Sequence, residues 1–408
     1  MALKKKRFRL IIIILLFIIY FFLAARPVPH EIILANKWIS PLTSQQAFTG
    51  SSEDTESPVF SSNYRQDLLF PFTLGRHFGY VDSAGRFAVN KTLNENIYLS
   101  KNMWTEYGAE PASIEIKNIF DETVTRMENT AGYPILLDDR IFILGSDQNS
   151  LSEINTDGRL LWTYEFGAPL TCIDAGAGLV LTGSLDGIIE VFNSVGKRVF
   201  YFEPGGSRYE VILGCAISRD GSRIGIISGV DQQRFLLLER FGNTRGGSSA
   251  DARNASGFDA SGDYKVVYHE FLDTGFRRPV RINFIDEDRR IVFERSGGIG
   301  CYNIRTRRGI FIPLDGEIHA VEESGEQGFF FIITAHGFNE KKLVGIRFPQ
   351  DRWGWFPFSL FSQNGFMETD AIFLKAQFKS DAVFLDRTGS MLVVGGGTTL
   401  ISFALEEK

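Results

Sequence analysis

The stretch that decides the fold is LVLTGSLDGIIEVFNSVGKRVF, residues 179–200. Short runs of Leu, Ile, Val and Phe alternate in it with Gly, Asp and Asn, which is the pattern of short strands joined by tight turns. Its two marker glycines, Gly183 and Gly196, are 13 residues apart. We expect the first to let the chain reverse at positive φ and the second, in Asn-x-x-Gly, to close the next hairpin. The unit is therefore predicted to be three strands joined by two turns.

The same unit occurs on either side of this stretch. Marker glycines with the same spacing of 13 residues are Gly145 and Gly158 before it, and Gly229 and Gly242 after it. Successive units are offset by 38 and then 46 residues. Because one small antiparallel sheet cannot bury both of its faces, units of about 40 residues that repeat in this way are typical of propeller blades.

Weaker copies of the unit extend the repeat over the rest of the chain. They are found at residues 78–87, 290–309, 329–348 and 381–403. No long stretch carries a helical period. Residues 67–408 are therefore predicted to form one all-β domain, a single β-propeller of about seven four-stranded blades.

The repeat also resembles a known family. The order of strand, Gly-Ser-x-Asp-Gly, strand, Asn-x-x-Gly and then Trp or Phe is similar to the quinoprotein-like (PQQ-like) repeat and its WD-repeat relatives, most specifically over residues 140–242. That family includes quinone-dependent dehydrogenases with a vicinal Cys pair, and non-catalytic scaffolds such as an outer-membrane assembly lipoprotein with an acylated Cys. This chain has neither feature. The resemblance therefore implies a propeller and a non-catalytic, membrane-anchored member, while the fold itself does not fix the function.

The N-terminus predicts a membrane anchor. Residues 1–9 are a basic stub, and residues 10–25 are an uncharged apolar run of 16 residues that we expect to form a transmembrane signal-anchor helix. Such a helix spans about 24 Å, slightly short of the ~30 Å hydrocarbon core. The basic stub should stay in the cytoplasm, which predicts a single-pass protein of the bacterial cytoplasmic membrane with an extracytoplasmic (periplasmic) domain. The alternative is a cleaved signal peptide, since Ala24 and Ala25 are small.

Two polar stretches are expected to lie outside the blades. Residues 26–66 contain Pro, Ser and Thr around an acidic centre, and we expect a flexible tether there. Residues 242–263 are rich in Gly, Ser and Asn, which favours a mobile insertion between blades over a binding loop that a partner orders.

Charge and composition argue against several functions. The formal net charge is −6, and the first 26 residues hold six positive charges and no acid, so the remainder carries −12. That excess of acids excludes nucleic acid as an expected partner. The five histidines show no metal-ligand spacing, and the three cysteines, each in an apolar run, allow at most one internal bridge. We therefore expect neither a redox cofactor nor a metal.

The first candidate binding segment is rich in arginine. Residues 277–308 hold nine arginines against four acids. Arg277, Arg278 and Arg281 begin this segment and are candidates for contact with an anionic partner. The alternative is that the arginines alternate along strands and point to different faces.

The second candidate binding segment is aromatic. Arg352, Trp353, Trp355 and Phe356 lie close together in the sequence, and clusters of Arg with aromatic residues are typical of interface anchors. Packing of the same rings between blades is the alternative.

These observations favour a membrane-anchored scaffold that binds a protein or another component of the cell envelope. Two alternatives stay open at this stage. One is a propeller enzyme with its active site in the central funnel, assembled from loops that are distant in the sequence. The other is a sensor that binds a ligand.

Overall fold

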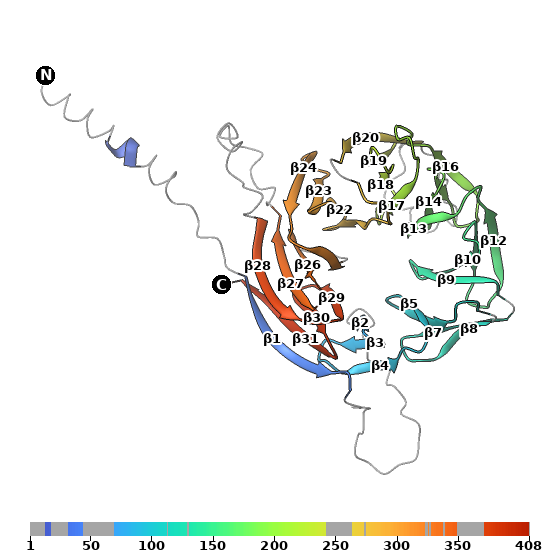
Figure 1. Ribbon diagram of the computed structural model, residues 1–408, viewed down its shortest axis with the longest axis horizontal. Coiled ribbons are helices and arrows are strands. Elements are labelled where there is room, and N and C mark those ends of the chain that lie inside the picture. The colour runs from blue at the N-terminus through green and yellow to red at the C-terminus, as the bar shows by residue number, and fades with distance from the viewer. Residues whose placement is uncertain are drawn as a thin grey trace, which may run out of the picture.

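The computed structural model describes residues 13–17, 32–43, 69–111, 113–128, 130–241, 263–272, 275–322, 325, 328–337, 339–348 and 371–407. These residues form a ring of β-sheets, seen end-on in Figure 1. The described part contains eight sheets, seven with four strands and one with three. The prediction of an all-β propeller is confirmed, and the prediction of about seven blades is wrong, because the ring has eight.

Blades 1 to 4 follow one another along the chain as antiparallel meanders. Blade 1 consists of β2 (Leu69–Leu74), β3 (His77–Asp82) and β4 (Phe87–Thr92). Blade 2 consists of β5 (Asn96–Leu99), β6 (Met103–Tyr107), β7 (Ser113–Asn118) and β8 (Thr123–Glu128). Blade 3 consists of β9 (Gly132–Leu137), β10 (Arg140–Gly145), β11 (Ser150–Ile154) and β12 (Leu160–Glu165). Blade 4 consists of β13 (Leu170–Gly176), β14 (Leu179–Ser184), β15 (Ile189–Phe192) and β16 (Arg198–Phe202).

Blades 5 to 8 complete the ring. Blade 5 consists of β17 (Ile212–Ile217), β18 (Arg223–Ser228), β19 (Arg234–Phe241) and β20 (Asp263–Phe271). Blade 6 consists of β21 (Ile282–Ile285), β22 (Arg290–Arg295), β23 (Gly298–Asn303) and β24 (Arg308–Pro313). Blade 7 consists of β25 (Glu317–Val321), β26 (Phe329–His336), β27 (Glu340–Arg347) and β28 (Ile372–Lys379). Blade 8 consists of β29 (Val383–Thr388), β30 (Met391–Gly396), β31 (Thr399–Glu407) and β1 (Ile32–Pro41).

Blade 2 is the blade that the glycine pattern does not reveal. Its turn between β7 and β8 has Asp121, with φ of 68°, where blades 3 and 4 have a glycine. The Asn118 side chain still accepts the backbone N–H groups of Phe120 and Glu122, at 2.9 and 3.0 Å. Asn155 makes the equivalent contacts in blade 3. Because Asp tolerates the left-handed region, this turn forms without the residue that marks it in the sequence.

The second marker glycine acts as predicted. Gly158 and Gly196 both have φ of 75°, the left-handed conformation that the turn requires. Gly242 lies outside the described residues. Gly196 also packs against the outer strand of the preceding blade, where a Cβ atom on it would lie 2.4 Å from Cγ of Trp162.

The first marker glycine has a different role in two of the three units. Gly229 has φ of 84°, as predicted, whereas Gly145 and Gly183 have no positive φ. At Gly183 a Cβ would lie 2.5 Å from Cγ2 of Ile212 and 2.7 Å from Sγ of Cys172. These two glycines therefore make room for neighbouring side chains rather than reverse the chain.

The ring is closed by its N-terminal strand. β1 pairs antiparallel with β31, from Ile32 opposite Glu407 to Pro41 opposite Thr399. The Trp38 indole donates to the carbonyl of Ser83 in blade 1 at 3.0 Å, so β1 also fastens blade 8 to blade 1. The range predicted to be a flexible tether, 26–66, thus contains a strand of the propeller. In Figure 1 this strand lies beside the last strands of the chain.

The structure contradicts the predicted membrane anchor. In the described part of the chain no helix is long and apolar enough to cross a membrane. Of the run 10–25 only residues 13–17 are described, as helix, and the others lie outside the described residues. The prediction of single-pass anchoring by this segment is therefore wrong, and so is the location derived from it.

Apolar and ionic contacts between successive blades form the core. Between blades 3 and 4 the Trp162 ring stacks on Phe192 at 6.1 Å between centroids. Its indole N–H donates to Glu153 at 2.6 Å, and Glu153 pairs with Arg140 at 2.6 Å. Burial of these polar groups is tolerated because each of them has a hydrogen-bonding or ionic partner.

Candidate partner-binding surface

The three arginines predicted as binding residues lie between β20 and β21 and are exposed. Arg278 is held in place: its guanidinium bonds both carboxylate oxygens of Glu294, at 2.5 and 3.0 Å, and lies 4.5 Å from the centroid of the Phe276 ring. The Glu294 carboxylate raises the pKa of Arg278 further. This pair fixes the loop against β22.

Arg281 also has a structural contact. Its guanidinium donates to the backbone carbonyls of Ile318 and His319, at 3.0 and 3.2 Å, and so joins blade 6 to β25 of blade 7. Arg277 differs from both, because the structure records no polar contact of its side chain with any described residue. Of the three, Arg277 is the one whose guanidinium is open to a partner.

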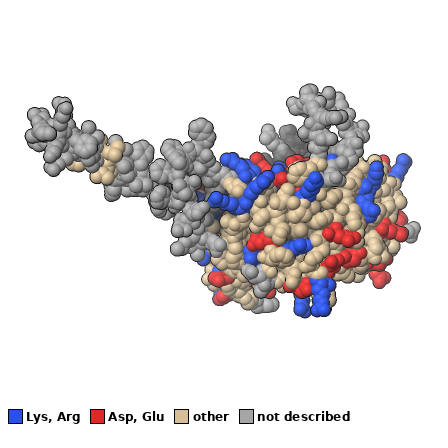
Figure 2. Space-filling model, turned by 90° about the horizontal axis from the view of Figure 1, so that it is seen from above, with Lys and Arg blue, Asp and Glu red and all other residues tan. Residues whose placement is uncertain are grey.

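The other arginines of residues 277–308 do not join Arg277 in one patch. Arg290 is buried and pairs with Asp286, which also binds Arg289. Arg295 pairs with Glu270 of blade 5 at 2.8 Å. Figure 2 shows, for one side of the ring, basic and acidic residues interspersed among uncharged ones.

The second predicted segment cannot be placed. Arg352, Trp353, Trp355 and Phe356 lie outside the described residues.

Arg277 belongs to a set of loops at one end of the ring, which we call the connection face. Here the outer strand of one blade leads into the inner strand of the next. It includes residues 203–211 and 275–281, and the hairpin 229–233 between β18 and β19. The hairpin contacts the first of these loops, since the backbone N–H of Val230 donates to the Tyr209 carbonyl at 3.3 Å.

A buried glutamine joins the hairpin to the second loop. Gln233 is 1% exposed, and its amide donates to the carbonyls of Gly229 and Phe276, at 3.1 and 3.2 Å. Its carbonyl oxygen accepts the N–H of Phe276 at 3.2 Å. Arg234 donates to the carbonyls of residues 204 and 205 and so fixes the other loop. The loops are therefore tied to one another.

Four exposed side chains lie on these fastened loops and the turn beside them; we call them the connection patch. They are Leu185, Arg208, Tyr209 and Arg277. Tyr209 and Leu185 are 61% and 51% exposed, high values for apolar side chains. The turn that carries Leu185 adjoins the loop of Tyr209, because a Cβ on Gly187 would lie 2.8 Å from that of Glu210.

One acid beside the patch, Asp231, is already engaged. Asp231 accepts the Ser207 hydroxyl and the Arg208 backbone N–H, and the Ser207 hydroxyl lowers the pKa of this carboxyl. The Arg208 guanidinium, by contrast, has no recorded polar contact with a described residue. Arg208 and Arg277 thus present two guanidinium groups that no described residue engages. Only Arg277 was singled out from the sequence, because the patch is assembled from separate blades.

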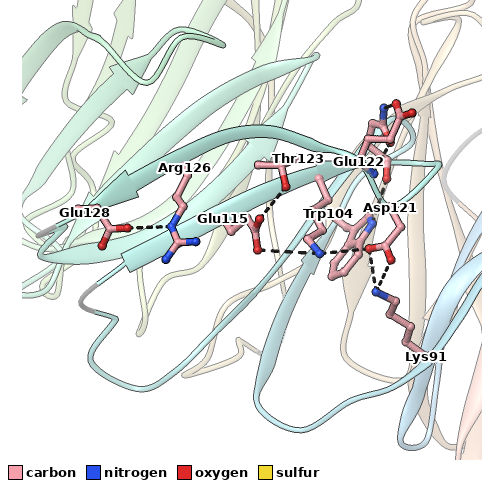
Figure 3. Close-up of polar contacts among 10 residues, drawn as sticks. Lys91, Trp104, Glu115, Asp121, Glu122, Thr123, Arg126 and Glu128 are labelled. Atoms are coloured by element: carbon pink, nitrogen blue, oxygen red, sulfur yellow. Dashed lines mark hydrogen bonds and ion pairs between the residues drawn. The ribbon is translucent and has the colours of Figure 1, made fainter.

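A second polar cluster lies where blade 1 meets blade 2 (Figure 3). Lys91 of β4 bonds both oxygens of Asp121, at 2.7 and 2.6 Å, and its ammonium lies 4.9 Å from the Trp104 ring centroid. Lys117 pairs with the same carboxylate at 3.3 Å. These charges are mutually satisfied, so the cluster serves to join the two blades.

The described residues hold no group of three or more His, Cys, Asp or Glu side chains that could bind a metal ion.

The comparisons with known proteins support the β-propeller fold. A family model described as a beta-propeller protein matches residues 1–246 and 259–383. The chain therefore belongs to this family of β-propeller proteins.

Individual relatives add little about function. A protein of Treponema pallidum (strain Nichols), named only as uncharacterized, is 27% identical over 250 residues, which are 61% of this chain and 61% of that protein. The chain thus spans about three fifths of that relative's length.

Two solved structures share the fold at low sequence identity. The computationally designed Ika8 protein has a TM-score of 0.52 at 11% identity, over 84% of this chain and 98% of that one. BamB from Moraxella catarrhalis has a TM-score of 0.50 at 10% identity, over 91% of this chain and 100% of that one. At such identities the likeness concerns the fold alone.

Proposed function

We propose that this protein is a non-catalytic scaffold that binds a partner protein through the connection patch. The observation that carries this proposal is the exposure of Tyr209 and Leu185, together with two arginines that no described residue engages, on loops held by buried contacts. Tyr and Arg dominate the energetics of protein interfaces. Loops that are already ordered reduce the entropy cost of binding.

The chemistry of the patch favours a partner with an acidic segment. A guanidinium binds a carboxylate through two parallel hydrogen bonds, which gives both strength and orientation. Tyr209 and Leu185 offer an apolar area next to these charges. We therefore propose that the partner presents Asp or Glu side chains next to an apolar residue.

We also propose that the repeat is of the quinoprotein-like type. The motif Gly-Ser-x-Asp-Gly followed by Asn-x-x-Gly supports this, together with the shared fold with BamB.

The scaffold proposal is tested by site-specific photo-crosslinking in cells. A photoreactive residue at position 209 should give a discrete cross-linked partner, identified by mass spectrometry. The variant Arg208→Ser/Arg277→Ser should lose this product, and Tyr209→Ala should bind the purified partner more weakly. Both should stay folded, since exposed substitutions usually change stability by less than about 0.5 kcal/mol.

The matched control is Arg159→Ser, an exposed arginine in the turn between β11 and β12. It should leave the cross-linked product unchanged. Binding should weaken as salt increases, because the contact is ionic. Equal cross-linking from position 159, or full cross-linking in the double arginine variant, would refute the connection patch as the binding surface.

A further inference from the structure

Two cysteines from different blades lie on adjacent inner strands. Cys172 is on β13 of blade 4 and Cys215 is on β17 of blade 5. The two strands are joined by side-chain contacts on both sides of these cysteines. The Thr171 hydroxyl donates to the Ile212 carbonyl at 2.5 Å, and the Ile217 N–H donates to Asp174 at 2.8 Å.

Both side chains pack in the same apolar cluster between blades 4 and 5. Burial raises the pKa of the Cys215 thiol, and the nearby Cys172 thiol raises it further. Gly183 makes this approach possible, because a Cβ there would lie 2.7 Å from Sγ of Cys172. The third cysteine, Cys301, is buried in a separate cluster between blades 6 and 7.

We propose that Cys172 and Cys215 form a reversible disulfide between blades 4 and 5. This modification does not depend on the proposed scaffold function. It would close a covalent loop over residues 172–215, and this loop contains Leu185, Arg208 and Tyr209 of the connection patch.

The bond would form by exchange with an external small-molecule disulfide. The thiolate of Cys172, which is only partly buried, attacks that disulfide and releases one thiol, leaving a mixed disulfide on Cys172. The Cys215 thiolate then attacks Sγ of Cys172 and releases the second thiol. Two protein thiols are oxidised and one external disulfide is reduced to two thiols, which take up the two protons.

The burial of Cys215 sets the order of these steps. Burial raises the pKa of the Cys215 thiol well above its ordinary value, so its thiolate is scarce. Cys172 therefore reacts first, and the second step is the slower one. Its proximity to the mixed disulfide makes this step intramolecular.

The test treats the folded full chain with oxidised glutathione, blocks remaining thiols with N-ethylmaleimide, and digests the protein with trypsin. The three cysteines fall in separate tryptic peptides, 160–197, 209–219 and 296–305. We expect a product that joins 160–197 to 209–219, two mass units lighter than their sum. Reduced glutathione should reverse it. Cys301→Ser should behave like the unaltered chain.

Two variants separate the steps. Cys215→Ala should stop at a glutathione adduct on Cys172, and Cys172→Ser should give no joined peptide. Oxidation should raise the midpoint of thermal unfolding in the unaltered chain and in Cys301→Ser, and leave it unchanged in the two pair variants. A folded chain that accumulates only the Cys172 adduct with both cysteines present would overturn the proposal. A peptide joined through Cys301 would overturn it equally.

Discussion

At the scale of single residues, aspartates carry the tight turns between the first and second strands of several blades. Asp138 and Asp288 have φ of 50° and 60°, a region that Asp tolerates better than most side chains. The Asp288 carboxylate also accepts the backbone N–H of Arg219 in the neighbouring blade, at 2.9 Å. Asp288 therefore shapes a turn and joins two blades.

Stability should depend on pH through these turns. Burial raises the pKa of Asp288 above its ordinary value, with a further contribution from nearby Asp220. Because the folded state holds the proton more tightly than the unfolded state, the ionised form costs stability at neutral pH. That cost disappears as the pH falls through the raised pKa.

Asp288→Asn tests this effect while keeping a hydrogen-bond acceptor and a residue suited to the left-handed turn. We expect the variant to be at least as stable as the unaltered chain at pH 7, with the difference shrinking toward acid pH. Urea unfolding at a series of pH values measures it. Asp231→Asn is the contrast: its pKa is lowered, so it should lose stability at neutral pH. A clear loss of stability in Asp288→Asn at pH 7 would show that the charge itself is needed.

At the scale of strands and turns, each blade fastens the one before it. The turn that leads into the outermost strand of a blade packs on the outer strand of the preceding blade. Gly196 lies on Trp162 in this way, and Gly85 lies on Trp38 of β1 with a Cβ position 2.7 Å from the ring. The glycine is thus required twice, for its positive φ and for the close approach.

Gly196→Ala should separate these two requirements when compared with Gly178→Ala. Gly178 has φ of 72° and nothing within 4 Å of a Cβ, so its variant should lose only about 1–2 kcal/mol from backbone strain. Gly196→Ala carries the same strain and also forces a Cβ against Trp162, which adds roughly 1–3 kcal/mol. Urea unfolding of both variants gives the difference. Equal losses would mean that Trp162 moves aside at no cost.

The same contacts explain how far the sequence predicts these elements. Short apolar runs separated by glycines predict seven of the eight blades, because these are local signals. Blade 2 is not predicted; Asp121 makes the turn for which blades 3 and 4 use a glycine. The roles of Gly145 and Gly183 are also missed, because they depend on side chains from other strands.

At the scale of the whole molecule, the features that could not be predicted from the sequence are those that join segments distant in the chain. The connection patch combines residues of blades 4, 5 and 6, and Cys172 and Cys215 come from two blades into one apolar cluster. From the sequence these cysteines are simply buried and 43 residues apart. Ring closure is the extreme case, because residues 32–41 pair with residues 399–407. No local sequence pattern predicts a strand pairing between segments so far apart in the chain.

Ring closure by β1 gives the last prediction. A chain that begins at residue 42 lacks β1, which leaves β31 as an open edge and removes Trp38 from its place between blades 8 and 1. We expect it to unfold at lower urea concentration than a chain that begins at residue 27, and to self-associate through the exposed edge. The Trp38 contact alone should be worth about 3 kcal/mol. Adding a peptide of residues 30–43 should restore stability, because it supplies the missing strand, and the same peptide with Trp38→Ala should restore less. Equal unfolding midpoints for the two chains would mean that the other strands hold the ring closed without β1.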